Sequence, residues 1–110
     1  MNLNDYQERA RRTAIYPQPL GGLPVYPALK LAGEAGEVAE KIGKVLRDEG
    51  GVLGPHRSVE LAKELGDVLW YVANLAADLG FDLEQIGQMN LDKLESRALR
   101  GVITGSGDNR

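Results

Sequence analysis

The stretch Gly33-Glu34-Ala35-Gly36-Glu37-Val38 decides the fold, and Glu64-Leu65-Gly66-Asp67-Val68 repeats its order of glutamate, glycine, acid and valine. Each copy lies in a proline-free run with apolar residues at helical spacing, so each is predicted to form part of a helix. Residues three positions apart share one face of a helix. Each copy therefore carries one acidic pair: Glu34 with Glu37, and Glu64 with Asp67.

The two predicted helices, residues 26–48 and 58–79, carry their acids at the same offset from their apolar stripes, at about 100° per residue. If these stripes pack together, the four carboxylates converge at the edge of the seam. Gly36 and Gly66 would then allow the two backbones to approach closely. A single ExxE is typical of a solvated charged face, but a second copy at the same offset favours a shared site.

Clustered carboxylates need neutralisation, because like charges in a partly buried site cannot all remain ionised without a counter-charge. Oxygen ligands suit hard cations, with Mg²⁺ the first choice and Mn²⁺ the next. The sequence therefore predicts a metal site with these ligands: Glu34, Glu37, Glu64 and Asp67.

Length and composition narrow the other possibilities. A chain of 110 residues is expected to form one domain, residues 1–110, with an extended tail over 101–110. The net charge of -3 argues against nucleic-acid binding, which needs a basic surface. The absence of cysteine excludes disulfides and thiolate sites. No signal peptide or membrane-spanning run of apolar residues is found, so we expect no membrane association and a cytoplasmic location.

The remaining segments predict two further helices and two loops. Asn4-Asp5 is expected to cap a first helix that runs to about Ala14, and a loop over 16–24 follows. This loop could close over a ligand, with Tyr16 or Tyr26 stacking on a base, but a plain connector is the favoured interpretation. A second loop over 49–57 contains His56, and Ser58 is the expected N-cap of the helix after it. The last helix is predicted over 83–99, after a capping box of Asp82 with Gln85.

Polar and cationic residues provide candidates for phosphate binding. Asn90, Lys93 and Arg97 lie on one stripe of the last helix, because they are spaced by three and four residues. Lys41 shares a stripe with the first acidic pair. Arg110 ends a tail whose backbone amides could wrap a phosphate, although composition alone favours a frayed terminus. All five are predicted to bind substrate.

With these features in place, the chain resembles the all-α nucleoside triphosphate pyrophosphohydrolases, the MazG-like family, over nearly its whole length. The resemblance rests on residues 32–41, which contain ExxE, and residues 63–71, which contain ExxD. Members carry these motifs on two antiparallel helices and bind Mg²⁺ through the carboxylates. They split a (deoxy)nucleoside triphosphate into a monophosphate and pyrophosphate. They form dimers or tetramers, so the resemblance implies a helical hairpin that completes a four-helix bundle by oligomerisation.

Matched position by position, the four motif acids take the place of the family's metal ligands. Asn90, Lys93 and Arg97 match downstream polar positions that contact the phosphates or complete the metal site. Tyr71 matches a position that lines the nucleoside pocket in dCTP-directed relatives. Two positions depart from the pattern. Gly33 replaces a second glutamate found in many members, which affects the number of metals, and Lys44 replaces the base-stacking tryptophan of dCTP-directed relatives.

The resemblance implies metal-assisted hydrolysis, in which two or three Mg²⁺ ions bridge carboxylates and phosphate oxygens. Glu37 or Glu64 is the expected proton acceptor. Alternatives with the same architecture are a phosphoribosyl-ATP pyrophosphohydrolase and a dUTP- or dCTP-selective hydrolase. A non-catalytic helical dimerisation module is the alternative outside enzymes. A di-iron carboxylate bundle is disfavoured, because its sites use Glu-x-x-His motifs and the chain has a single histidine.

Overall fold

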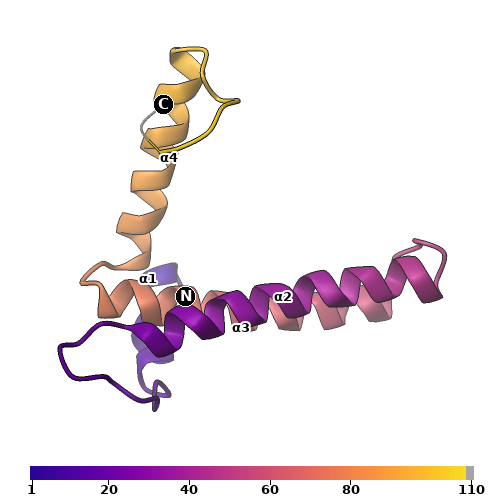
Figure 1. The fold of residues 1–110 in the computed structure, drawn as a ribbon, viewed down its shortest axis with the longest axis horizontal. Helices are drawn as coiled ribbons and strands as arrows, with labels where there is room; N and C mark the ends of the chain where they lie inside the picture. Colours follow the sequence, from indigo (N-terminus) through magenta and orange to yellow (C-terminus); the bar gives the residue numbers. More distant parts are fainter. Residues whose placement is uncertain (109–110) are drawn as a thin grey trace.

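The computed structural model describes residues 1–108, and this part of the chain is all-helical. Its helices are α1 (Leu3–Arg11), α2 (Val25–Asp48), α3 (Pro55–Asp78) and α4 (Leu83–Leu99). Helices α2 and α3 lie side by side as a long antiparallel hairpin, while α1 packs against α3 at one end of it (Figure 1). Helix α4 starts at that end and points away from the hairpin. The all-α prediction, with a hairpin and flanking helices, is confirmed.

The core lies where α1, α3 and α4 meet. Small side chains allow close packing there: Ala10, Ala73, Ala76 and Leu83 form the buried cluster. Gln7 is buried beside it, and its amide group donates hydrogen bonds of 3.0 Å to the carbonyls of Ala73 and Phe81. Its oxygen accepts one of 3.2 Å from the amide of Leu83. A single polar side chain therefore satisfies backbone groups at the turn between α3 and α4.

The ends of α1 and α3 differ from the sequence-based expectation. Helix α1 is capped by Asn2, in a capping box with Asp5, and it ends at Arg11, three residues before the predicted Ala14. Helix α3 begins at Pro55, so Ser58 is not its N-cap. The reason is that proline suits the first helical position, where its missing N–H needs no partner. His56 accordingly lies in the first turn of α3, not in a loop.

The other helix ends agree with the prediction. The capping box of Asp82 with Gln85 is confirmed, with a hydrogen bond of 2.7 Å from the Gln85 amide to the Asp82 carboxylate. Helix α4 spans Leu83–Leu99 as expected. Gly50 and Gly80 each follow a helix cap with positive φ, at 63° and 88°. Both positions need the left-handed conformation that glycine adopts without strain.

The close backbone approach expected at Gly36 and Gly66 is not found among residues 1–108. A Cβ built at either position would meet nothing within 4 Å. The hairpin seam is instead filled by side chains, and Val45 and Leu61 are buried along it. The backbone at these two glycines is therefore exposed on the surface of the hairpin.

The chain after α4 folds back beside that helix (Figure 1). Val102 donates a hydrogen bond of 2.9 Å to the carbonyl of Arg97. Asp108 pairs with Lys93 at 3.0 Å and with Arg97 at 3.3 Å. Among the described residues, no helix is long and apolar enough to cross a membrane.

Candidate active site

Three of the four predicted metal ligands meet across the α2–α3 hairpin. Glu34 and Glu37 come from α2 and Glu64 comes from α3, and one carboxylate oxygen from each lies within 4.8 Å of the others. The spacing of three residues places the two α2 acids on one face, and packing of the apolar stripes brings α3 beside them.

The fourth predicted ligand, Asp67, lies outside this group of three. It lines an adjacent cavity of about 310 Å³ together with Glu34, Trp70 and Tyr71. Asp67 belongs to α3, as Glu64 does, one turn further along the helix. Glu34 is common to the acid cluster and the cavity, so the two features are parts of one continuous site.

Cations on the hairpin balance the acid cluster in part. The Lys41 ammonium group lies 3.6 Å from Glu64 Oε1 and 4.0 Å from Glu60 Oε2. Glu60 is also paired with Arg57 at 2.9 Å and His56 at 3.1 Å. The Arg57 hydrogen bond, above all, lowers the pKa of Glu60. Lys41 therefore points into the acidic site, as its position on the acid-bearing stripe of α2 predicts.

The acid cluster fits a divalent cation by its donor chemistry. Glu64 Oε2 is buried and has no hydrogen-bond partner within residues 1–108. A buried carboxylate oxygen without a donor is costly, and a metal ion would satisfy it. Carboxylate oxygens from two helices are the ligand type that hard cations such as Mg²⁺, Mn²⁺ and Ca²⁺ take.

Two tyrosines, Tyr6 and Tyr71, lie close enough to Asp67 to feel its charge. Burial, followed by the neighbouring Tyr26 and then by the negative charges of Glu34 and Asp67, raises the pKa of Tyr71. Burial and the charge of Asp67 likewise raise the pKa of Tyr6. Both phenols therefore stay protonated at neutral pH and can donate hydrogen bonds at this end of the site.

The predicted phosphate-binding residues of α4 lie apart from the acids in the single chain. Within residues 1–108, α4 contacts α1 and α3 but not α2. Asn90 and Lys93 line a separate cavity of about 300 Å³ on α4. Arg97 is buried, and it donates hydrogen bonds of 3.2 Å and 3.3 Å to the Gly107 carbonyl and to Asp108. Arg110 lies outside the described residues.

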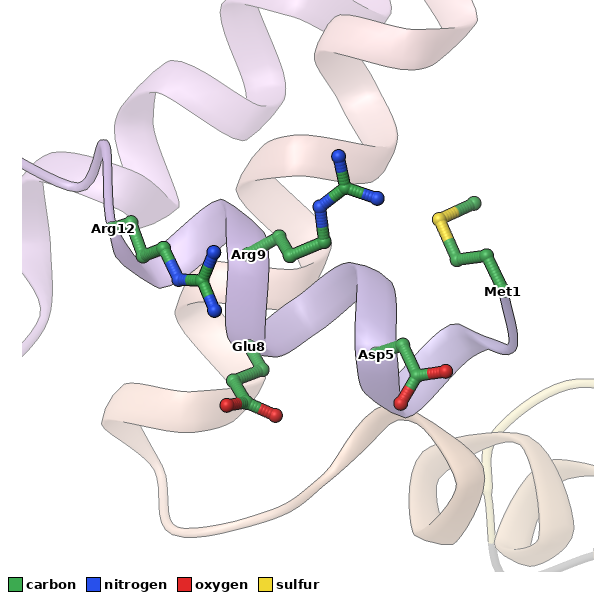
Figure 2. Close-up of a pocket in the computed structure, with 5 residues that line it drawn as sticks. All are labelled: Met1, Asp5, Glu8, Arg9 and Arg12. Carbon is green, nitrogen blue, oxygen red and sulfur yellow. The ribbon is translucent and has the colours of Figure 1, made fainter.

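Another cavity, of about 380 Å³, lies on α1 and offers no comparable chemistry. Figure 2 shows its lining residues, which come from one short segment and spread outward in different directions: Met1, Asp5, Glu8, Arg9 and Arg12. Two acids, Asp5 and Glu8, and two bases, Arg9 and Arg12, line the same cavity, so no charge of one sign dominates it.

The sequence that forms the hairpin and α4 matches the model of a known protein family. The family model described as the MazG nucleotide pyrophosphohydrolase domain matches residues 27–100, which include both acidic motifs. The chain belongs to the MazG family. The MazG match begins in the first turn of α2 and ends just after α4, so α1 lies before it.

The chain also matches a phage protein over the full length of both sequences. The chain is 50% identical over 115 residues to the "Gene 37 protein" of Mycobacterium phage L5, and the match covers 100% of both chains. No solved structure matches the chain. MazG domains are nucleotide pyrophosphohydrolases that generally use divalent metals, and the acid cluster contains three carboxylates that could hold such a metal.

Trp70 and Thr13 of this MazG domain were not predicted as site residues from the sequence. Trp70 lines the cavity next to Asp67, and its indole N–H donates a hydrogen bond of 3.1 Å to Thr13 Oγ1. Trp70 follows Asp67 by three residues, so helical spacing alone could have placed it on the acidic face. Thr13 comes from a distant segment, and no local pattern points to it.

Proposed function

We propose that this MazG domain hydrolyses (deoxy)nucleoside triphosphates to a nucleoside monophosphate and pyrophosphate, with Mg²⁺ as its metal and Mn²⁺ as a substitute. The observation that carries the proposal is the convergence of Glu34, Glu37 and Glu64 beside the cavity shared with Asp67. The family supplies the reaction class, and removal of such triphosphates from the nucleotide pool would be its role.

The four motif acids would hold the metal. When bound, the metal would polarise phosphate oxygens and lower the pKa of a water molecule. Glu64 has a buried oxygen without a hydrogen-bond partner in the described chain, which suits a ligand. Glu37 is exposed at the edge of the cluster. A carboxylate that the metal does not fully engage can take a proton, and Glu37 and Glu64 are the two candidates for the general base.

Substrate binding would use residues beside the acid cluster and residues at the cavity. Lys41 carries a positive charge beside Glu64, and Tyr71 offers a protonated hydroxyl at the cavity. Asn90, Lys93 and Arg97 lie on α4, which does not contact α2 in the described chain. For these three residues to reach phosphates at the acid cluster, α4 would have to come from a second copy or change direction.

We further propose that the active form is a homodimer or homotetramer that completes a four-helix bundle. Large apolar side chains remain exposed on the hairpin, with Ile42 at 50% and Leu65 at 55%. Helix α4 also leaves Met89 at 57% and Leu91 at 53% exposed. Apolar helix faces without a cover are typical of chains that bury them in an oligomer. Sedimentation equilibrium tests this, and a monomer at assay concentration would contradict it.

The decisive experiment is an assay of pyrophosphate release. The substrate panel contains all canonical NTPs and dNTPs, dUTP and several oxidised nucleotides, each with Mg²⁺, with Mn²⁺ and with EDTA. We expect release of monophosphate and pyrophosphate with either metal and none with EDTA. The best substrate would show whether the enzyme selects dUTP or dCTP.

Failure of every nucleotide with folded protein would contradict the proposal. Phosphoribosyl-ATP is then the next substrate to assay, because its pyrophosphohydrolase has related acidic helices. If that also fails, thermal unfolding with and without Mg²⁺ decides the remaining alternative. A non-catalytic dimerisation module predicts a melting temperature that does not depend on the metal.

A further inference from the structure

Four aromatic rings form a connected group beside the acid cluster. Tyr16 stacks on Tyr26 with centroids 5.5 Å apart and an interplanar angle of 14°. Tyr16 also meets Trp70 edge-on at 6.2 Å, and Trp70 meets Tyr71 edge-on at 4.8 Å. The group joins the loop after α1 to the start of α2 and to the acid-bearing part of α3.

The Trp70 side chain has a defined orientation within this group. Its indole N–H donates to Thr13 Oγ1 at 3.1 Å, and its ring packs against the buried cluster of α1, α3 and α4. The Trp70 carbonyl accepts a hydrogen bond of 3.0 Å from the side chain of Asn74, which is fully buried. The ring is thus held in place without a ligand.

The cavity beside Trp70 has two chemically different sides. Two carboxylates, Glu34 and Asp67, line it together with the rings of Trp70 and Tyr71. Its volume of about 310 Å³ lies at the lower end of the range for small-molecule sites. A ligand that fits both sides has a flat aromatic part and an anionic part that reaches the acid cluster through a metal.

We propose that Trp70 forms the aromatic wall against which the nucleobase of the substrate lies, and so distinguishes a nucleotide from other polyphosphates. This inference rests on the proposed function. Every base has a π-face, so contact with the indole gives affinity for nucleotides in general with little choice among bases. The hydrogen bond to Thr13 occupies the indole N–H, which leaves the ring surface as the part available for the base.

Trp70 is the only tryptophan of the chain, so its fluorescence reports on the cavity directly. The full-length protein is titrated in Mg²⁺ with non-hydrolysable α,β-imido dATP and α,β-imido dCTP. Tripolyphosphate and an abasic deoxyribose 5′-triphosphate serve as base-free controls. We expect both nucleotides to quench the Trp70 emission and both base-free compounds to leave it near the level with Mg²⁺ alone. Equal quenching by all four compounds, or none by the nucleotides while the protein hydrolyses dNTPs, would overturn the inference.

Two variants of Trp70 distinguish a contact between an aromatic ring and the base from the effect of side-chain size alone. Trp70→Phe keeps a flat ring, and Trp70→Leu keeps an apolar side chain that can still pack against the core. We expect Trp70→Leu to raise KM for dNTPs about tenfold or more, with kcat much less affected and Trp70→Phe within about threefold of wild type. A folded Trp70→Leu protein with wild-type KM would overturn the inference, and if it does not fold, the fluorescence titration decides.

The two proposals fail in different ways. If no nucleotide is hydrolysed but the imido nucleotides quench Trp70 and the base-free compounds do not, the base contact stands and the proposed reaction is wrong. If hydrolysis proceeds with Mg²⁺ while Trp70 responds to no nucleotide, the reaction stands and the base lies elsewhere.

Discussion

The Lys41 ammonium group lies 3.6 Å from Glu64 Oε1, across the seam between α2 and α3. This ion pair joins the two acidic motifs, because Lys41 shares a helix face with one and Glu64 belongs to the other. It places a cation of the protein beside the oxygens that would bind a metal. If Glu64 binds a metal as proposed, Lys41 would compete with that metal in the substrate-free protein and could meet a phosphate of the bound substrate.

The first prediction concerns this competition. We expect Lys41→Met to tighten Mg²⁺ or Mn²⁺ binding to the substrate-free protein and to raise KM for nucleotides. The loss in unfolding free energy should be about 1 kcal/mol or less, because the side chains of Lys41 and Glu64 are 30% and 17% exposed. Calorimetric titration with Mn²⁺ measures the metal affinity. Weaker metal binding in the variant would show that Lys41 does not compete with the metal.

The second prediction concerns the acids. We expect Glu37→Gln and Asp67→Asn to lower kcat by more than about 100-fold, since replacement of a metal ligand costs more than loss of a supporting group. The fold should persist, because each change removes a negative charge from a crowded acidic site. Pyrophosphate release and thermal unfolding measure the two effects.

Glu40→Gln is the matched control for those variants. Glu40 lies on α2 between the acid cluster and the helix end, and it pairs with Lys44 at 3.4 Å within one turn. Removing its charge should leave turnover unchanged. Retained activity in both Glu37→Gln and Asp67→Asn would overturn the assignment of the metal site.

The third prediction concerns the segment that carries Tyr16. Its hydroxyl donates a 2.5 Å hydrogen bond to Asp78, which also pairs with Arg11 at 2.9 Å. We expect Tyr16→Phe to lower the unfolding free energy by about 1–2 kcal/mol, because the bond is made to a charged group. Urea unfolding measures the loss. An unfolding free energy of Tyr16→Phe equal to that of the wild type would show that the Asp78 bond does not stabilise the fold, because the ring and its stacking on Tyr26 are kept in this variant.

The pH dependence of this bond has a definite sign. Burial first, then the hydrogen bond to Asp78, raises the pKa of Tyr16 above its usual value of 10.0. A raised pKa means that the folded state favours the protonated phenol, so its contribution is complete below pH 10 and is lost as the pH rises further. The absorbance of tyrosinate during alkaline titration should therefore show a late-titrating group that Tyr16→Phe removes.

The fourth prediction concerns the tail. The Lys93 hydrogen bond, followed by its charge and then by Arg97, lowers the pKa of Asp108. A lowered pKa means that docking of the tail is complete above the usual aspartate range and is lost as the pH falls through the lowered value. Amide chemical shifts of residues 102–108 should move in that acidic window. In Asp108→Asn they should be shifted already at neutral pH, and unchanged shifts in this variant would show that the ion pairs do not hold the tail.

The acidic hairpin was predictable because its information is local. Spacing of three and four residues assigns side chains to helix faces, and two helices with matching offsets then place Glu34, Glu37 and Glu64 together. The limits of α4 and its capping box could be predicted equally well, since Asp82 and Gln85 form their hydrogen bonds within one turn. The start of α3 was missed because Pro55 was assigned to the preceding loop, although the first helical position accepts proline.

Sequence alone therefore determined the helices, the acid-bearing faces and the family, all of which depend on residues within a few turns of one another. Only the tertiary structure decided that Asp67 lines a cavity with Trp70, that Thr13 holds that ring, and that Asp108 pairs with Lys93 and Arg97. It also decided that α4 points away from the hairpin. The physical reason is that these contacts depend on the path of the loops and on how the helices pack, and periodicity within one helix does not encode either.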